Sequence, residues 1–179
     1  SLAAHASFGA RLQRAYIECR LNGKLPGAQL ESLADQPMGH LNSYPVTGLT
    51  KLGALGIQNQ CQFPDVAYSR LIDRAAQLDT TSHGLRYMLY IYSGYYHQRL
   101  KQLGPAVAAV QAAHRMSADT PVPLILAARW YLEAGDPPQA SSQLQQASDI
   151  DREYHAGFTG DITQLQGQIK AAISRPKPR

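Results

Sequence analysis

Apolar residues recur along this chain every three or four positions, and that spacing predicts helices from one end to the other. In GDITQLQGQIKAAIS (160–174), isoleucines and a leucine form one stripe, while glutamines and a lysine occupy the opposite face. No segment sustains the alternation of a β-strand, and prolines stand where helices would begin. We therefore expect an all-α protein, with loops at 36–44 and 152–159 and helices at 4–22, 26–35, 45–59, 64–78, 82–102, 105–117, 121–134, 137–149 and 160–174.

The apolar pattern repeats itself in the second half of the chain. Residues 121–154 reproduce the small and apolar positions of residues 87–120 at a constant offset of 34 residues. The five matched pairs are Gly94 with Ala128, Ala106 with Ala140, Val110 with Leu144, Ala113 with Ala147, and Met116 with Ile150. Small side chains at these positions would let two helices approach closely, and the larger ones would fill the layer between hairpins.

These residues resemble the tetratricopeptide repeat (TPR), a 34-residue helix–turn–helix unit with a small residue at position 8 and alanine at positions 20 and 27. The sequence QASSQLQQASDID carries the second-helix pattern, with Asp151 where the family places the aspartate of a closing Asp-Pro. Arg152 and Ala118 replace the closing proline, and Lys101 replaces the turn glycine of the earlier unit. The resemblance implies a right-handed superhelix of antiparallel helix hairpins, a TPR-like solenoid.

A third, degenerate copy precedes these two. It places Gly56 at position 8 and has a tyrosine where the family has alanine; its second helix carries Tyr68, Ile72, Ala75 and Leu78, and four inserted residues separate it from the next copy. We expect an N-terminal helical hairpin at 1–44, TPR-like repeats at 45–158, and a capping helix with a basic tail at 159–179. Because the chain opens Ser-Leu and closes SRPKPR, we also expect a fragment of a larger protein.

Composition narrows the classes of partner. The chain has 179 residues, 44% of them hydrophobic, and a net charge of +4. Its lysines and arginines are scattered, which argues against nucleic acid as a partner. The longest apolar stretch, PVPLILAARWYL (121–132), is too short to cross a bilayer, so we expect no membrane span.

The two cysteines, Cys19 and Cys61, allow two interpretations. Small buried thiols are the simpler one, and we expect free thiols. A disulfide would instead indicate an oxidising compartment.

The sequence lacks the motifs of common catalytic and metal sites. Its six histidines form no HExxH or other ligand spacing, and no GxSxG, P-loop or GxGxxG is present. His97 takes a position that is an aromatic core position in the family, so we expect it to pack. We therefore expect no enzyme activity, no cofactor and no metal.

The tyrosine-rich run RYMLYIYSGYYHQR (86–99) supplies the candidate binding surface. In TPR arrays a concave groove is lined by first-helix positions 2, 5, 9, 12 and 13. The resemblance therefore implies a groove formed by Met88, Ile91, Tyr95, Gln98, Arg99, Val122, Ile125, Arg129, Leu132 and Glu133. Tyrosine and arginine suit a recognition surface because they combine contact area with hydrogen bonding. The lysine and asparagine with which some arrays clamp a carboxylate are replaced by Ile91, Tyr95, Ile125 and Arg129.

The sequence predicts a non-catalytic scaffold module that binds a protein or peptide. One alternative is a periplasmic assembly domain of a bacterial membrane protein linked to envelope polysaccharide. Another is an RNA-binding helical repeat, which a steep salt dependence of nucleic-acid affinity would reveal. The sequence leaves open whether the compartment is cytoplasmic or periplasmic, what the partner is, and the oligomeric state.

Overall fold

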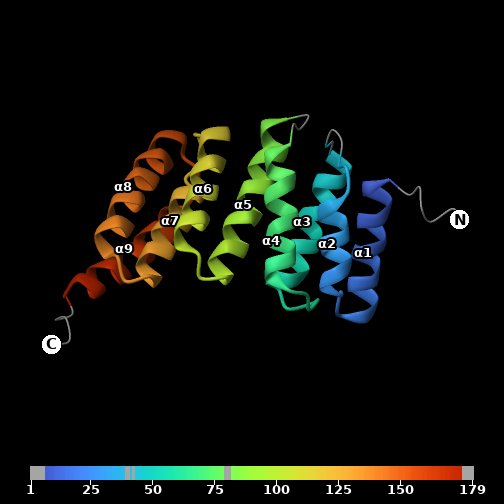
Figure 1. The fold of residues 1–179 in the computed structure, drawn as a ribbon. Helices are drawn as coiled ribbons and strands as arrows, with labels where there is room; N and C mark the ends of the chain where they lie inside the picture. The colour runs from blue at the N-terminus through green and yellow to red at the C-terminus, as the bar shows by residue number, and fades with distance from the viewer. Residues whose placement is uncertain (1–6, 39–40, 42, 79–81, 175–179) are drawn as a thin grey trace, which may run out of the picture.

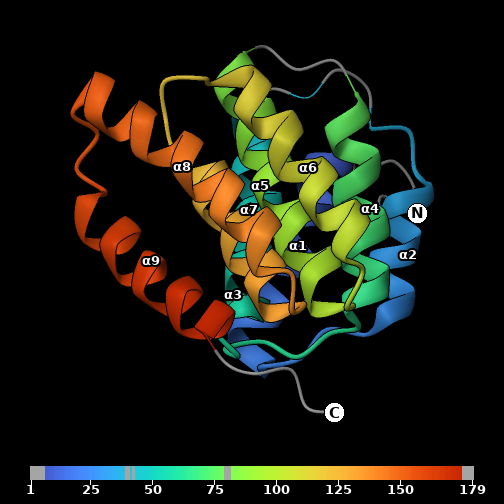
Figure 2. The same ribbon diagram turned by 90° about the vertical axis from the view of Figure 1, so that its left-hand side faces the viewer.

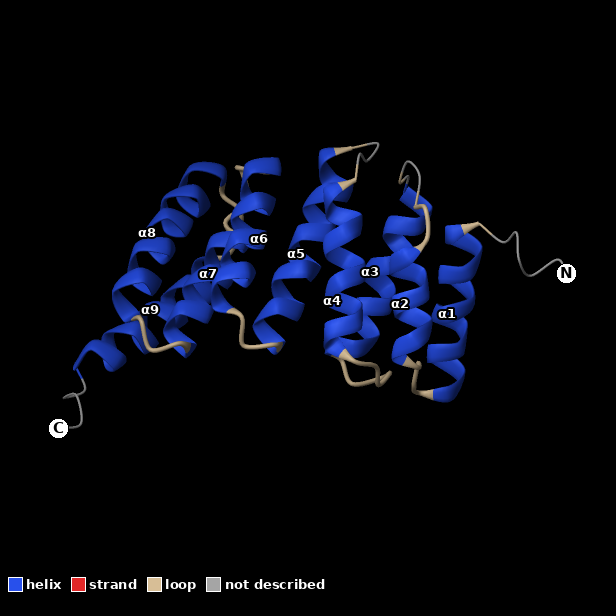
Figure 3. Ribbon diagram, in the orientation of Figure 1, coloured by secondary structure: helices blue, strands red, loops and turns tan. Residues whose placement is uncertain are grey.

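A computed structural model describes residues 7–38, 41, 43–78 and 82–174. Within these residues the chain forms helices and loops but no β-strand (Figures 1 and 3). The helices are α1 (Phe8–Asn22), α2 (Gly27–Asp35), α3 (Ser43–Ile57), α4 (Asp65–Gln77), α5 (His83–Arg99), α6 (Leu103–Met116), α7 (Val122–Glu133), α8 (Pro137–Tyr154) and α9 (Thr159–Ser174). None of these helices is both long and apolar enough to span a bilayer.

The nine predicted helices are confirmed, with differences at their ends. Residues 152–154, predicted as loop, continue α8. The helix continues because Arg152 stands where a closing proline would have stopped it, and His155 ends it in the left-handed conformation (φ 50°). Residues 43 and 44 likewise belong to α3 and not to the predicted loop. The predicted start of the first helix, residues 4–6, lies outside the described residues.

Most helices pack against their neighbours in the sequence. α5 contacts α4 and α6, α7 contacts α6 and α8, and α9 contacts α8 and α7. Three further pairs skip one helix: α1 with α3, α2 with α4, and α3 with α5. Figures 1 and 2 show the resulting row of helices, which runs from α1 at one end to α9 at the other.

The hydrophobic core follows the same order along the chain. One cluster of buried side chains belongs to α1–α5, the next to α5–α7, and the last to α7–α9. Since each cluster shares a helix with the next, every hairpin buries its apolar face partly against its neighbour.

The 34-residue register seen in the sequence is present in the backbone. At the end of α5, the N–H groups of Leu100, Lys101 and Gln102 donate to Tyr96, Gln98 and His97. At the end of α7, the residues 34 positions later repeat this pattern: Ala134, Gly135 and Asp136 donate to Trp130, Leu132 and Tyr131. Lys101 (φ 60°) adopts the left-handed conformation that Gly135 (φ 79°) adopts in the next hairpin, so a lysine does occupy a glycine position.

Burial also follows the register. Ala106, Ala113, Ala140 and Ala147 are all fully buried, as the pattern predicted. A Cβ added at Gly94 would lie 2.8 Å from Cγ1 of Val110 and 3.2 Å from the carbonyl oxygen of Ala106. This glycine therefore lets α5 approach α6 closely, as expected from its small size.

The degenerate copy solves the same packing problem differently. Tyr68 stands where the later hairpins have alanine, and it is fully buried. A Cβ added at Gly53 would clash with the phenol of Tyr68, so a glycine on α3 makes room for the larger side chain on α4. The hydroxyl of Tyr68 donates to the carbonyl oxygen of Leu49 at 2.7 Å, which satisfies its one buried donor.

The expectation of free thiols is wrong. Cys19 and Cys61 are joined by a disulfide, with their Cα atoms 5.6 Å apart. The sequence separation of 42 residues gave no hint of this, because the pairing depends on how α1 lies beside the α3–α4 loop. There the N–H of Leu25 donates to the oxygen of Gln62, and the N–H of Gln62 donates to the oxygen of Gly23, both at 2.8 Å.

Asp151 explains the one feature of the closing motif that survives in this chain. Its buried carboxylate accepts from the N–H of Phe158 at 2.7 Å and from the hydroxyl of Thr159 at 2.8 Å. It thereby caps the start of α9 from the preceding helix. The Phe158 N–H is the main reason that the pKa of Asp151 is lowered, and the Thr159 hydroxyl adds to the effect.

Asp151→Asn should lower the melting temperature by several degrees at neutral pH, because an amide cannot accept from both donors equally well. Since the folded pKa is lowered, the contribution of Asp151 is complete above the ordinary carboxyl pKa and is lost as the pH falls through the folded value. Melting the protein and the variant from about pH 7 to about pH 3 should show the gap between them narrowing in acid. A gap that stays constant over that range would contradict this role.

Candidate interaction face and the polar network around Asp73

Helix α5 lies at the centre of the candidate face. A Cβ added at Gly53 would lie 2.8 Å from Cδ1 of Tyr92, so this ring lies against α3. Tyr95 meets Trp130 of α7 edge to face, with ring centroids 5.7 Å apart. Both tyrosines are only partly buried, and Met88 is 39% exposed on the same helix. The tyrosine-rich run therefore contacts the helices on both sides and still offers surface to solvent.

A hydrogen bond joins α5 to α7 on this face. The side-chain amide of Gln98 donates to a carboxylate oxygen of Glu133 at 2.7 Å. Glu133 thereby spends one acceptor within the protein, and its charge remains. The bond shows that predicted groove residues from two successive hairpins lie side by side.

A pocket of about 270 Å³ continues the face from α7 to α9. Within the described chain the guanidinium of Arg129 has no polar partner, although two carboxylates line the same pocket. The lining residues are Arg129, Leu132, Glu133, Asp161, Gln164, Leu165 and Gln168. The residues from α9 were absent from the predicted groove, because that helix was expected only to cap the array.

The other predicted groove residues differ in their surroundings. Ile91 and Ile125 are buried at 8% and 5% exposure and belong to the core. Val122 is partly buried. Arg99 is committed to the protein: its Nε donates to Asp65 at 2.9 Å, and its guanidinium lies 5.7 Å from the centre of the Tyr96 ring. That Tyr95 and Arg129 line one wall stays a prediction, whereas Gln98 and Glu133 are in contact.

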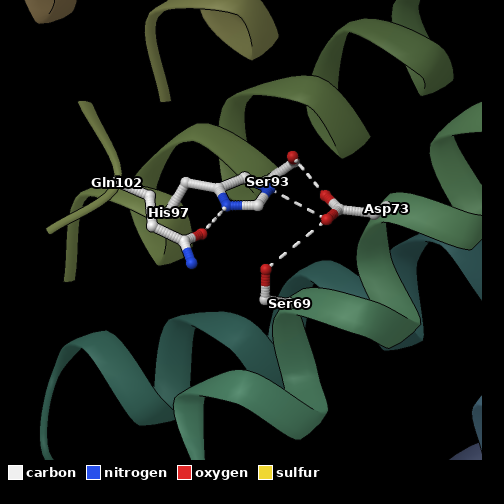
Figure 4. A network of polar contacts seen from close by, with 5 residues as sticks. All are labelled: Ser69, Asp73, Ser93, His97 and Gln102. Carbon is white, nitrogen blue, oxygen red and sulfur yellow. Dashed lines mark hydrogen bonds and ion pairs between the residues drawn. The ribbon is translucent and has the colours of Figure 1, made fainter. Parts of the chain in front are cut away.

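A second cluster of polar side chains lies where α4, α5 and the start of α6 meet (Figure 4). The carboxylate of Asp73 accepts from the hydroxyl of Ser93 at 2.6 Å and, at the limit of 3.5 Å, from that of Ser69. Nε2 of His97 lies 2.8 Å from the same carboxylate, and Nδ1 lies 2.7 Å from the amide oxygen of Gln102. Since a carboxylate only accepts, Nε2 carries a proton in this arrangement.

The geometry of this network does not prepare a nucleophile. Ser93 donates to Asp73 and not to His97, so the serine has no base at hydrogen-bond distance within the network. Both ring nitrogens of His97 are occupied, and its side chain is only 16% exposed. The network instead holds α5 to α4 and to Gln102, the residue that precedes α6, which agrees with the packing role predicted for His97.

Titratable groups elsewhere in the described chain give no sign of a metal site. No cluster of three or more histidine, cysteine, aspartate or glutamate side chains that could hold a metal ion occurs among the residues that the structure describes. Burial raises the pKa of Tyr68, Tyr92 and Tyr96, so these phenols stay neutral hydrogen-bond donors.

The fold and the candidate face together define an all-α protein whose helices pack in sequence order and which carries a mixed aromatic and charged surface. Comparison of the chain with protein-family models, with curated proteins and with solved structures gave no match in any of the three.

Proposed function

We propose that this chain is a non-catalytic module that binds a protein or peptide, with its hairpins arranged as a TPR-like right-handed superhelix. Two features support the TPR-like arrangement: the repetition of turn hydrogen bonds at 34 residues and the alternation of buried small residues. The binding role depends chiefly on one observation. The Gln98–Glu133 hydrogen bond joins the faces of α5 and α7 beside Arg129, an exposed cation with no polar partner in the described chain.

The face suits an extended peptide for a chemical reason. Glutamine amides at positions 98, 164 and 168 can each donate and accept, which matches the alternating N–H and C=O groups of a peptide backbone. The partly exposed Tyr95 offers a flat apolar surface, and Arg129 offers a charge-assisted donor for a carboxylate or a carbonyl oxygen. Tyrosine and arginine are the residue types that most often dominate binding energy at such surfaces.

The disulfide favours one of the settings considered for this module. Disulfides persist in oxidising compartments, so the Cys19–Cys61 bond supports a periplasmic or extracellular location over the cytosol. A periplasmic assembly domain of a bacterial membrane protein is therefore the second candidate function. The disulfide supports only the compartment of this candidate, and its link to envelope polysaccharide remains a hypothesis.

The variant Tyr95→Ala with Arg129→Glu should weaken partner binding by about 5- to 30-fold, which corresponds to about 1–2 kcal/mol. Its far-ultraviolet circular dichroism should stay helical, because both side chains reach solvent. The measurement is a titration of the captured partner, or of a peptide library, against both proteins.

The matched control is Tyr154→Ala with Arg115→Glu, which makes the same chemical changes at exposed positions of α8 and α6. This control should bind as the wild type does. Equal binding by all three proteins would place the ligand surface elsewhere. An affinity for RNA that falls steeply with added salt would support the RNA-binding alternative instead.

A further inference from the structure

The Cys19–Cys61 disulfide is the covalent tie between the α1–α2 hairpin and the rest of the described chain. It joins the last turn of α1 to the loop after α3, next to the two backbone hydrogen bonds that pair residues 23–25 with Gln62. We propose that this bond is a redox-sensitive lock, and that its reduction by a dithiol releases α1 from α3 while the later hairpins stay folded.

The interior of the first hairpin gives α1 little to hold on to. Between α1 and α2 lie two open cavities of about 460 and 640 Å³, and Glu18 and Gln29 line both. What bridges the two helices there is polar: the Gln29 amide donates to Glu18 at 2.7 Å, and Arg14 donates to the same carboxylate at 2.8 Å. Exposed polar bridges of this kind contribute little to stability.

The main apolar support of α1 comes from α3. Phe8, Leu12 and Ala15 are buried, and a Cβ added at Gly48 would lie 3.0 Å from Cδ2 of Leu12. On its other side α1 exposes Ile17 at 46% and Leu21 at 78%. A terminal helix with one apolar neighbour belongs to the part of a protein that opens at the lowest free energy. Closing the 42-residue loop opposes that opening by restricting the open chain.

The chemistry of release is thiol–disulfide exchange. Cys19 and Cys61 are 0% and 2% exposed, so exchange requires a local opening first. A thiolate of the dithiol then attacks one sulfur, and the other cysteine leaves as a thiolate and takes a proton. The second thiol of the reductant resolves the mixed disulfide, so two electrons and two protons end on Cys19 and Cys61 and the reductant becomes a disulfide. Release uncovers the apolar faces of α1 and α3, a surface distinct from the face proposed for peptide binding.

Hydrogen exchange of the oxidised protein and of the protein reduced with dithiothreitol tests this inference. Amides of α1 should exchange at least ~10-fold faster after reduction, whereas those of α7 and α8 should change less than ~2-fold. A double variant, Cys19→Ala with Cys61→Ala, should show fast α1 exchange that dithiothreitol no longer alters. Unchanged α1 exchange in the reduced protein, or an equal acceleration in every helix, would overturn the proposal. Should the double variant fail to fold, the reduced wild type decides the question alone.

Discussion

Tyr68→Ala should lower the free energy of unfolding by about 3–5 kcal/mol, which is the cost of deleting a large buried aromatic side chain. Tyr68 is fully buried, and its ring lies 4.2 Å from that of Tyr96 and 5.5 Å from that of Phe63, centroid to centroid. Alanine would leave a cavity at the centre of the first core cluster and would also remove the hydrogen bond to Leu49.

Chemical denaturation followed by circular dichroism measures this loss. Tyr68→Phe keeps the ring and removes only the hydroxyl, so it should cost about 0.5–1.5 kcal/mol. Tyr154→Ala removes a tyrosine that is 53% exposed on α8 and should stay within about 0.5 kcal/mol of the wild type. A Tyr68→Ala protein as stable as the Tyr154→Ala protein would contradict the packing described for α3 and α4.

Ala140→Leu should lower the free energy of unfolding by about 1–3 kcal/mol, because it overpacks a close helix contact. Ala140 is fully buried at the start of α8, in the cluster that also contains Ala128 of α7. Three extra carbon atoms at this position would push α8 away from α7. The same substitution would test the repeat register, since Ala106 is fully buried 34 residues earlier.

Thermal melts compare this variant with a neighbour on the same helix. Ser141→Leu adds similar volume at an exposed position and should change the stability by no more than about 0.5 kcal/mol. An Ala140→Leu protein that melts at the wild-type temperature would mean that α8 can move without cost, and the assignment of residues 121–154 as a tightly packed repeat would then fail.

Local signals account for most of what could be predicted. The apolar spacing located all nine helices because it is a property of each segment alone, and the buried alanines followed from their shared register. The end of α8 was missed because Arg152, unlike proline, gives no stop signal and the left-handed His155 is visible only in the backbone. Lys101 is a similar case, since nothing local in a lysine indicates a positive φ.

The candidate face divides along the same line. A resemblance to a repeat family selected Gln98 and Glu133, which do meet, but it could not tell that Ile91 and Ile125 are buried or that Arg99 is held by Asp65. The contribution of α9 to the Arg129 pocket also went unseen, because it depends on the angle at which that helix returns to α7.

The sequence by itself determined the helical class, the helix order and the small residues at the hairpin contacts, because each is encoded within one turn or one repeat of the chain. Only the tertiary structure decided the Cys19–Cys61 bond, 42 residues apart, and the link between Asp73 and His97, 24 residues apart. Both connect segments from different hairpins. Their contact is set by how α1 lies on α3 and how α5 lies on α4, and helix spacing carries no record of either geometry.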